Sequence, residues 1–307
     1  MRKSKTSEAL MGLWRSFLME VDCKLDRVTV SGKVSETVNI IDIAVKNHWT
    51  RKIDRSGNEF AVLEREFDNG DHVNKAVLMS NPYQDYGWRI DTSNHLNKFE
   101  LKCVLLMIPY LANVHLTRID VAFDFINGQY EPMKHVIIRD RARQSEIRDV
   151  SNLTSIYGSA GDLQTLYCGA RSSDYMIRIY NKKLETTRHH GVLPDNVDCW
   201  ERWELQLRGK RSNQWLDSAK LMLSQIKYPS YEDLSPMERA ILYAIDNRII
   251  SFKDFGKEKA SKLRKLRKSG VGYSDAYAQA AGKSLESNTK KISEQVKLFL
   301  GQLKLDD

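Results

Sequence analysis

The 307-residue chain has few cysteines, prolines and glycines, and it has no long hydrophobic run. Its four cysteines, at 23, 103, 168 and 199, form no CxxC pair, which disfavours a disulfide framework and a zinc knuckle. The 16 glycines and 6 prolines exclude a collagenous chain. No apolar run approaches the roughly 20 residues of a membrane span, and no apolar signal segment follows the basic start. We therefore expect a reduced, cytoplasmic globular protein without a membrane partner.

Several common catalytic motifs are also missing. The sequence contains no GxxxxGK[ST] phosphate loop, which excludes a P-loop ATPase, and no GxSxG or HExxH motif. His189 and His190 are adjacent, and neighbours on a strand point to opposite faces. We therefore interpret this pair as loop residues and not as two metal ligands.

Positive charge is concentrated in one segment near the C-terminal end. The net charge is +8, but residues 251–270 carry eight cations against Asp254 and Glu258, so this segment alone contributes +6. Such a local excess is typical of a surface that binds phosphates. Leucines interleave with the cations and indicate an ordered helix, with Lys262, Lys265 and Lys268 as candidate DNA contacts. The alternative is a solvated, lysine-rich helix face.

The pattern of apolar residues predicts an α+β body over residues 1–209 and a helical, basic region over 210–307. Alternation predicts strands at 27–32, 60–66, 73–80, 88–92, 115–125, 164–169, 175–182 and 199–207. Helical spacing predicts helices at 9–19, 38–45, 96–107, 216–226, 235–248, 257–268 and 285–304. Leu96, Phe99, Cys103 and Leu106 are the expected apolar stripe of the 96–107 helix. The expected apolar stripe of the 285–304 helix consists of Leu285, Ile292, Val296, Phe299 and Leu303.

The strand at 115–125 carries charged residues where a sheet core needs apolar ones. Because side chains alternate along a strand, Arg118, Asp120 and Asp124 share one face. Two carboxylates two residues apart are about 7 Å apart at Cα and could share a divalent cation. The alternative is a solvent-facing strand with incidental charges.

The strand at 175–182 places Arg178, Tyr180 and Lys182 on one face. A tyrosine is a poor nucleophile because its pKa is about 10, but a neighbouring cation favours the phenolate. Tyr180 is therefore a candidate attacker of phosphorus, with Tyr175 as the next candidate. The alternative is an ordinary amphipathic-strand tyrosine with its hydroxyl in water.

A third polar strand, at 199–207, alternates in the same way. Arg202, Glu204 and Gln206 face one side, and Trp203 faces the other with two leucines. Glu204 could complete an oxygen-ligand site with Asp120 and Asp124.

Three segments together resemble a known family. LTRIDVAFDF (116–125), TLYCGARSSDYMIRIYNKKLE (165–185) and RWELQLRGK (202–210) are similar to the Rep-trans replication initiators of rolling-circle plasmids from Gram-positive bacteria. LDRVTVSG (25–32) resembles an early strand of the same family. The resemblance implies an antiparallel β-sheet nicking core, related to the His-hydrophobe-His endonucleases but without that histidine pair.

The resemblance also implies an activity. Initiators of this type nick one strand at the plasmid double-strand origin, and a tyrosine, here Tyr180, becomes joined to the 5′ phosphate. Arg178, Lys182, Lys183 and Arg202 are the expected DNA contacts near this nucleophile. The family acts as a homodimer, recruits a host helicase of the PcrA kind, and reads the origin through a region toward the C-terminus.

The family requires Mg²⁺ or Mn²⁺. We expect Asp120, Asp124 and Glu204 to be its ligands, with Asp91 in reserve. The sequence leaves two other functions open, which are a conjugative relaxase of an integrative element and a non-catalytic DNA-binding regulator.

Overall fold

The computed structural model describes residues 21–66, 70, 72–81, 87–93, 96–127, 136–137, 153–157, 163–170, 173–188, 191–247 and 249–304. The helix predicted at 9–19 and the His189–His190 pair lie outside these residues. Among the described helices, none combines the length and the apolar character needed to cross a membrane.

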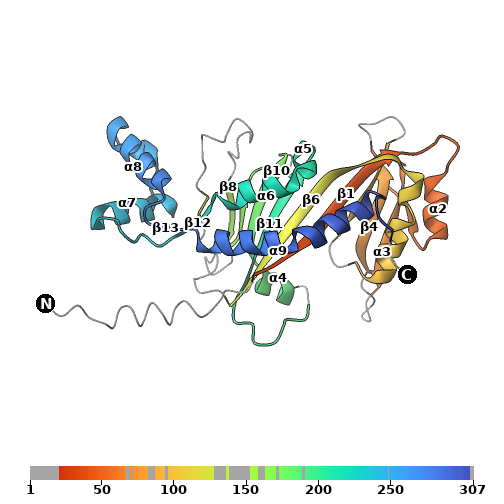
Figure 1. Cartoon of the computed structure of the whole chain (residues 1–307), viewed down its shortest axis with the longest axis horizontal. Helices are drawn as coiled ribbons and strands as arrows, with labels where there is room; N and C mark the ends of the chain where they lie inside the picture. Colours follow the sequence, from red (N-terminus) through yellow and green to blue (C-terminus); the bar gives the residue numbers. More distant parts are fainter. Residues whose placement is uncertain are drawn as a thin grey trace.

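An antiparallel sheet of ten strands forms the body of the molecule (Figure 1). Its spatial order is β2-β3-β4-β5-β1-β6-β11-β10-β9-β8. The strands are β1 (Val21–Lys33), β2 (Thr50–Ile53), β3 (Glu59–Glu66), β4 (His72–Ser80), β5 (Gly87–Thr92), β6 (Ala112–Ile126), β8 (Leu153–Tyr157), β9 (Leu163–Cys168), β10 (Tyr175–Asn181) and β11 (Trp200–Arg208). A second, three-stranded sheet joins β7 (Val136–Ile137), β12 (Ile226–Pro229) and β13 (Tyr273–Ser274).

Helices lie on the sheet and beyond its ends (Figure 1). They are α2 (Ile40–Lys46), α3 (Lys98–Leu105), α4 (Lys182–Arg188), α5 (Lys210–Asn213), α6 (Trp215–Leu223), α7 (Pro236–Asp246), α8 (Lys257–Ser269) and α9 (Ala276–Phe299), with short 3-10 turns η1 (Ile108–Tyr110) and η3 (Phe252–Asp254). The long α9 runs across one face of the sheet beside α6, whereas α7 and α8 stand apart at the left of Figure 1.

The core lies between the sheet and α9. Trp203 stacks on Tyr277 of α9, with ring centroids 6.2 Å apart, and Phe125 lies against both rings. Burial of this apolar area is the main stabilising contribution to the body. The predicted α+β class, with an antiparallel sheet and C-terminal helices, is confirmed. The boundary at residue 209 stays a prediction, and residues on both sides of it share this core.

The predicted long elements that fall within the described residues are present. The expected apolar stripe is wrong in the 96–107 helix and right for four of five residues in the last helix. In α3 and the two residues after it, Phe99 and Leu106 are exposed, while Val104 and Met107 are buried with Cys103. In α9, Leu285, Ile292, Val296 and Phe299 are buried as expected, but Leu303 is exposed and lies beyond the end of the helix. The short strands β2, β7, β8, β12 and β13 and the short helices α4 and α5 were not predicted, because too few residues in each establish a period.

Candidate active site

The face of the sheet opposite α9 carries the polar residues of the central strands. Alternation sends Trp203, Leu205 and Leu207 of β11 into the core and leaves Arg202 and Glu204 on the other face. The register then places Tyr180 beside Arg202 and Arg202 beside Asp124, in one row across β10, β11 and β6. The next row joins Arg178, Glu204 and Ala122 in the same order.

Tyr180 lies in the middle of this polar face. Its hydroxyl donates a hydrogen bond of 2.6 Å to Glu204 Oε1. The Arg178 guanidinium lies over the ring, 3.9 Å from its centroid, and also donates to Glu204 Oε2 at 3.1 Å. The residue is only 2% exposed, so these side chains cover it. Tyr180, Arg178 and Glu204 therefore form one hydrogen-bonded group.

Protonation of this group is set by burial and by neighbouring charge. Burial, followed by the negative charge of Glu204, raises the pKa of Tyr180. Burial and then the nearby Asp26 raise the pKa of Glu204 as well. Near neutral pH the Tyr180 hydroxyl therefore keeps its proton. Glu204, whose proton affinity is raised, already accepts a hydrogen bond from this hydroxyl.

The predicted alternative nucleophile lies elsewhere. Tyr175 is in the hydrophobic core, on the face of β10 opposite Tyr180. Because the two tyrosines are five positions apart on one strand, alternation alone requires this result.

Arg202 and Asp124 form a buried ion pair beside Tyr180. The guanidinium donates from Nε to Asp124 Oδ1 at 2.6 Å and from Nη2 to Asp124 Oδ2 at 2.8 Å. The Asp124 carboxylate also accepts from Trp200 Nε1 at 2.8 Å and pairs with Lys24 at 2.6 Å. Burial alone would raise the pKa of Asp124, but Arg202 and Lys24 hold it below its usual range.

The burial of Arg202 corrects one expectation. Arg202 is 1% exposed, and all three of its side-chain nitrogens donate to Asp124 or Asp26, so its donors are engaged inside the protein and not available to DNA. Its positive charge opposes the rise in the pKa of Tyr180.

The three carboxylates predicted to bind a metal do not gather into one ligand set. Asp124 is held by Arg202, and Asp120 accepts two hydrogen bonds from Arg118, at 2.8 and 2.5 Å. Glu204 is held by Tyr180 and Arg178. Within the described ranges, no group of three or more His, Cys, Asp and Glu side chains could hold a metal ion. The residues as arranged therefore do not fit the predicted site.

The reserve ligand Asp91 is also engaged. It accepts from Arg27 Nε at 2.7 Å and Nη2 at 2.5 Å, and from the Thr29 hydroxyl at 2.9 Å. This carboxylate fixes the Arg27 side chain on the polar face of β1 and β5.

Asp26 belongs to the site and was not singled out from the sequence. It lies where the register of β1 with β6 shifts between Leu25 and Arg27, which marks a β-bulge. Arg202 Nη1 donates to it at 3.3 Å, and its charge raises the pKa of both Glu204 and Asp120, after burial. Only the position of Asp26 within the family-like segment LDRVTVSG could have pointed to it in the sequence. The alternation of apolar residues does not reveal a bulge.

The two predicted lysine contacts have partners in the structure. Lys182, at the start of α4, pairs with Glu185 and lies 5.9 Å from the centroid of the Tyr180 ring. Lys183 donates to the backbone oxygens of Val197 and Asp198, at 2.8 and 3.0 Å. Lys182 is therefore close to Tyr180, whereas Lys183 connects the loop before β11 to α4.

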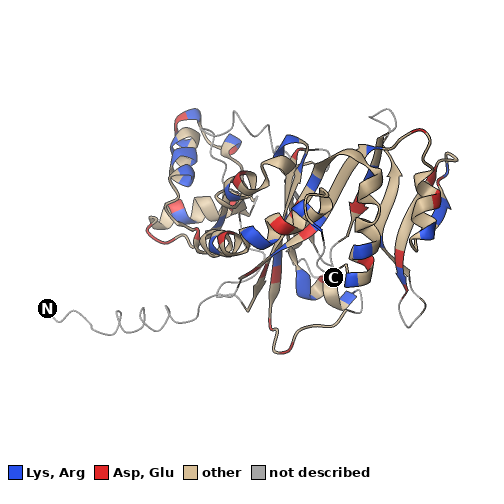
Figure 2. Cartoon of the chain, turned by 45° about the vertical axis from the view of Figure 1, so that its right-hand side comes forward, with Lys and Arg blue, Asp and Glu red and all other residues tan. Residues whose placement is uncertain are grey.

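The basic helix α8 is present, and its cations divide into two groups. Lys262, Lys265 and Lys268 are exposed on the face opposite the buried Ala260 and Leu263 (Figure 2). Arg267 turns inward and donates to Asp246 at 2.9 Å, and that carboxylate also accepts from the hydroxyls of Tyr231 and Tyr273. This network fixes α8 to α7 and leaves the lysine face on the outside.

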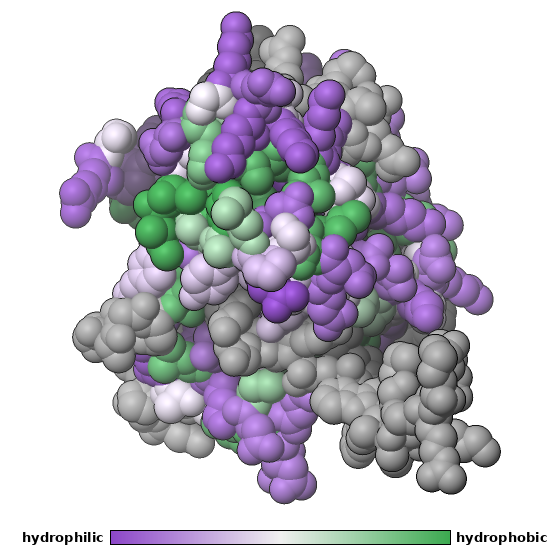
Figure 3. Space-filling view, turned by 90° about the vertical axis from the view of Figure 1, so that its left-hand side faces the viewer, coloured by the Kyte–Doolittle hydropathy of each residue, from purple (hydrophilic) through white to green (hydrophobic). Residues whose placement is uncertain are grey.

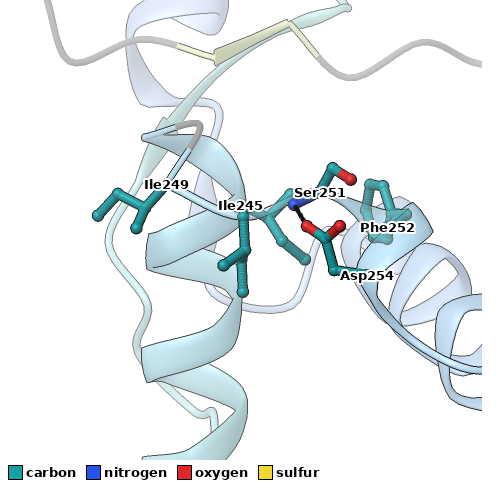
Figure 4. Close-up of a pocket in the computed structure, with 6 residues that line it drawn as sticks. Ile245, Ile249, Ser251, Phe252 and Asp254 are labelled. Atoms are coloured by element: carbon teal, nitrogen blue, oxygen red, sulfur yellow. Dashed lines mark hydrogen bonds between the residues drawn. The ribbon is translucent and has the colours of Figure 1, made fainter.

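The same helical region carries an apolar hollow. Six residues of α7, η3 and the loop between them line a volume of about 470 Å³: Ile245, Ile249, Ile250, Ser251, Phe252 and Asp254 (Figure 4). Seen from this side, apolar surface is surrounded by hydrophilic side chains (Figure 3). None of the lining residues belongs to the group around Tyr180.

Three comparisons relate the chain to known proteins. Residues 114–268 match the Rep_trans family, described as replication initiation factor. A replication initiation protein of Staphylococcus aureus is 27% identical over 193 residues, which is 62% of this chain and 56% of the relative. Another from Staphylococcus aureus is 32% identical over 111 residues, or 36% of this chain and 32% of the relative. The aligned part is therefore little more than half of the first relative and about a third of the second.

A solved structure is also similar. The rolling circle replication initiator protein from Geobacillus stearothermophilus gives a TM-score of 0.42 at 16% identity, covering 71% of this chain and 90% of that chain.

Proposed function

The chain belongs to the Rep_trans family of replication initiation factors, and from that premise we propose that it initiates rolling-circle replication of a plasmid. In this proposal it nicks one strand of the origin and holds the cut end on Tyr180. The observation that carries the proposal is the 2.6 Å hydrogen bond from the Tyr180 hydroxyl to Glu204. It gives a proton acceptor to the oxygen that would attack phosphorus in this reaction.

The proposed step is an exchange of one phosphate ester for another. Tyr180 Oη attacks the phosphorus of a DNA phosphodiester while its proton passes to Glu204 Oε1. The bond from phosphorus to the 3′ oxygen breaks, and this oxygen takes a proton from water to become a free 3′ hydroxyl. The new tyrosyl phosphodiester retains the 5′ phosphate, so the reverse exchange can rejoin the strand.

Arg178 is proposed to receive the phosphate. Its guanidinium covers the Tyr180 ring and spans to Glu204 at 3.1 Å, at the long end of ion-pair hydrogen bonds. A phosphate that enters here replaces Glu204 as the partner of Arg178. That exchange would bring positive charge to the phosphate oxygens and leave Glu204 free to take the tyrosine proton.

Origin duplex binding is proposed for α8. The exposed face of Lys262, Lys265 and Lys268 supports it, because rows of lysines on a rigid helix suit phosphate contacts. A homodimer, a host helicase of the PcrA kind and a cytoplasmic location stay predictions. A requirement for Mg²⁺ or Mn²⁺ also stays a prediction, and no step above depends on it.

The test is capture of the covalent intermediate. The purified chain is incubated with Mg²⁺ and a supercoiled plasmid that carries its gene and flanking DNA, and adducts are resolved on a denaturing gel. Tyr180→Phe should lose the adduct and keep duplex binding, because only the hydroxyl oxygen is removed. Tyr167→Phe is the matched control, since Tyr167 lies on the neighbouring strand β9 opposite Arg178 in the ladder. An adduct formed by Tyr180→Phe would disprove the assignment.

A further inference from the structure

A second cluster of guanidinium groups lies on the polar face, away from Tyr180. Arg208, at the end of β11, is paired in the ladder with Arg118 of β6, so two arginines stand side by side on neighbouring strands. Arg118 is in turn opposite Thr29 of β1, two residues beyond Arg27. From Glu204 to Arg208 is four residues along β11, or about 13 Å.

Two of these arginines are fixed by carboxylates and the third is not. Arg118 is held by Asp120, and Arg27 by Asp91, each through two hydrogen bonds. Within the described part of the chain, Arg208 has no side-chain hydrogen bond or ion pair. Burial, followed by the positive charge of Arg118, lowers the pKa of Arg208, with Arg27 adding to the effect. Asp120 and Asp91 oppose this effect, so three arginines and two aspartates leave one positive charge in excess, and this charge favours an anion beside Arg208.

The neighbouring residue on β11 supplies a second observation. Gln206 is 5% exposed and on the same face as Arg208, and its side-chain amide nitrogen has no hydrogen-bond partner among the described residues. Arg178 Nε, on the next strand, is buried and without a partner in the same way. A buried donor that lacks an acceptor costs about 1–3 kcal/mol, so its presence calls for a ligand that accepts from it.

We propose that Arg208 and Gln206, with Arg118 and Arg27, bind a backbone phosphate of the DNA strand at a position other than the one cut by Tyr180. The Arg208 guanidinium can bind two non-bridging oxygens of a phosphate at once. The Gln206 amide lies between this subsite and Glu204 along β11. The subsite rests on the proposed function in one respect, that the anion belongs to DNA. It would set the direction in which the single strand crosses the sheet.

The subsite is tested by binding of oligothymidylates of increasing length, followed by fluorescence anisotropy across a salt series. Arg208→Gln should weaken binding of the longer oligomers and lower the slope of log K against log salt by about 0.7, the value for one single-strand phosphate contact. In the Arg208→Gln variant the affinity should also reach its plateau at a shorter oligomer length, because a longer strand finds no second phosphate subsite to bind. Arg208→Lys keeps the charge and should keep the slope. Arg55→Gln is the control, an exposed arginine in the turn between β2 and β3.

The outcomes separate the subsite from the nicking proposal. Equal slope and affinity for Arg208→Gln and wild type would overturn the subsite, whatever Tyr180 does. An effect of Arg208→Gln on inorganic phosphate binding, with none on oligothymidylates, would identify a small-anion site and overturn it too. A loss of slope in Arg208→Gln together with an adduct in Tyr180→Phe would support the subsite and reject Tyr180 as the nucleophile. Unchanged thermal melting shows that Arg208→Gln is folded.

Discussion

Removal of one charge, by Asp124→Asn, is expected to destabilise the whole sheet. Asp124 is 2% exposed and Arg202 is 1% exposed, so neither can turn to water when its partner is lost. The variant keeps the shape of the side chain but leaves the Arg202 guanidinium buried beside a neutral amide. The hydrogen bonds from Trp200 and Lys24 to this carboxylate lose their charge at the same time.

The magnitude follows from the burial of the pair. Breaking a buried ion pair by removing one partner costs about 3–5 kcal/mol, because an uncompensated charge remains inside. Asp26 lies 3.3 Å from Arg202, and its negative charge reduces this destabilisation. The weakened bonds from Trp200 and Lys24 increase it. We therefore expect the free energy of unfolding to fall by about 3–5 kcal/mol.

The measurement is urea unfolding at neutral pH, with circular dichroism and tryptophan fluorescence compared to establish two-state behaviour. Asp42→Asn is the matched control, because the Asp42–Arg51 pair is exposed and such pairs contribute about 0–1 kcal/mol. The pKa of Asp124 is lowered in the folded state, so its contribution is complete above the ordinary aspartate pKa of about 4. The difference between wild type and variant should narrow as the pH falls below that value.

Two results would refute this reasoning. A loss below about 1 kcal/mol would place the pair among surface ion pairs. A loss that appears only when Mg²⁺ is present would show that Asp124 acts first as a cation ligand, as the sequence suggested.

Two further predictions concern catalysis and origin binding. Glu204→Gln should slow adduct formation by about 10²–10⁴-fold without changing duplex affinity. In rapid-quench assays the wild-type rate should rise with pH as Glu204 loses its proton, because burial and Asp26 raise the pKa of this residue. A Glu204→Gln rate that rises with pH in the same way would exclude Glu204 as the base. Replacing Lys262, Lys265 and Lys268 by Ala should reduce the salt slope of duplex binding by about two to three units, at about 0.9 per phosphate contact. Lys283, Lys290 and Lys297 on the exposed side of α9 form the control triple, and an effect no larger than theirs would leave α8 without a role in DNA binding.

Membership of the polar face was determined by the sequence alone. Alternation is a local property of a strand, so the order of residues within each strand is enough to assign Tyr180, Glu204 and Asp120 to its polar side. The buried stripe of α9 from Leu285 to Phe299 was predictable for the same reason, from helical spacing within one segment.

The partners on that face were decided only by the tertiary structure. Strand order places β11 between β6 and β10, and this pairing brings Glu204 to Tyr180 and Arg202 to Asp124. Local alternation contains no information on which strand lies beside which, so three acids that looked like one metal site proved to have separate cationic partners. The bulge that brings Asp26 to the site depends likewise on the pairing of β1 with β6. Register and strand order come from long-range packing of the two faces, and no single segment of the sequence carries them.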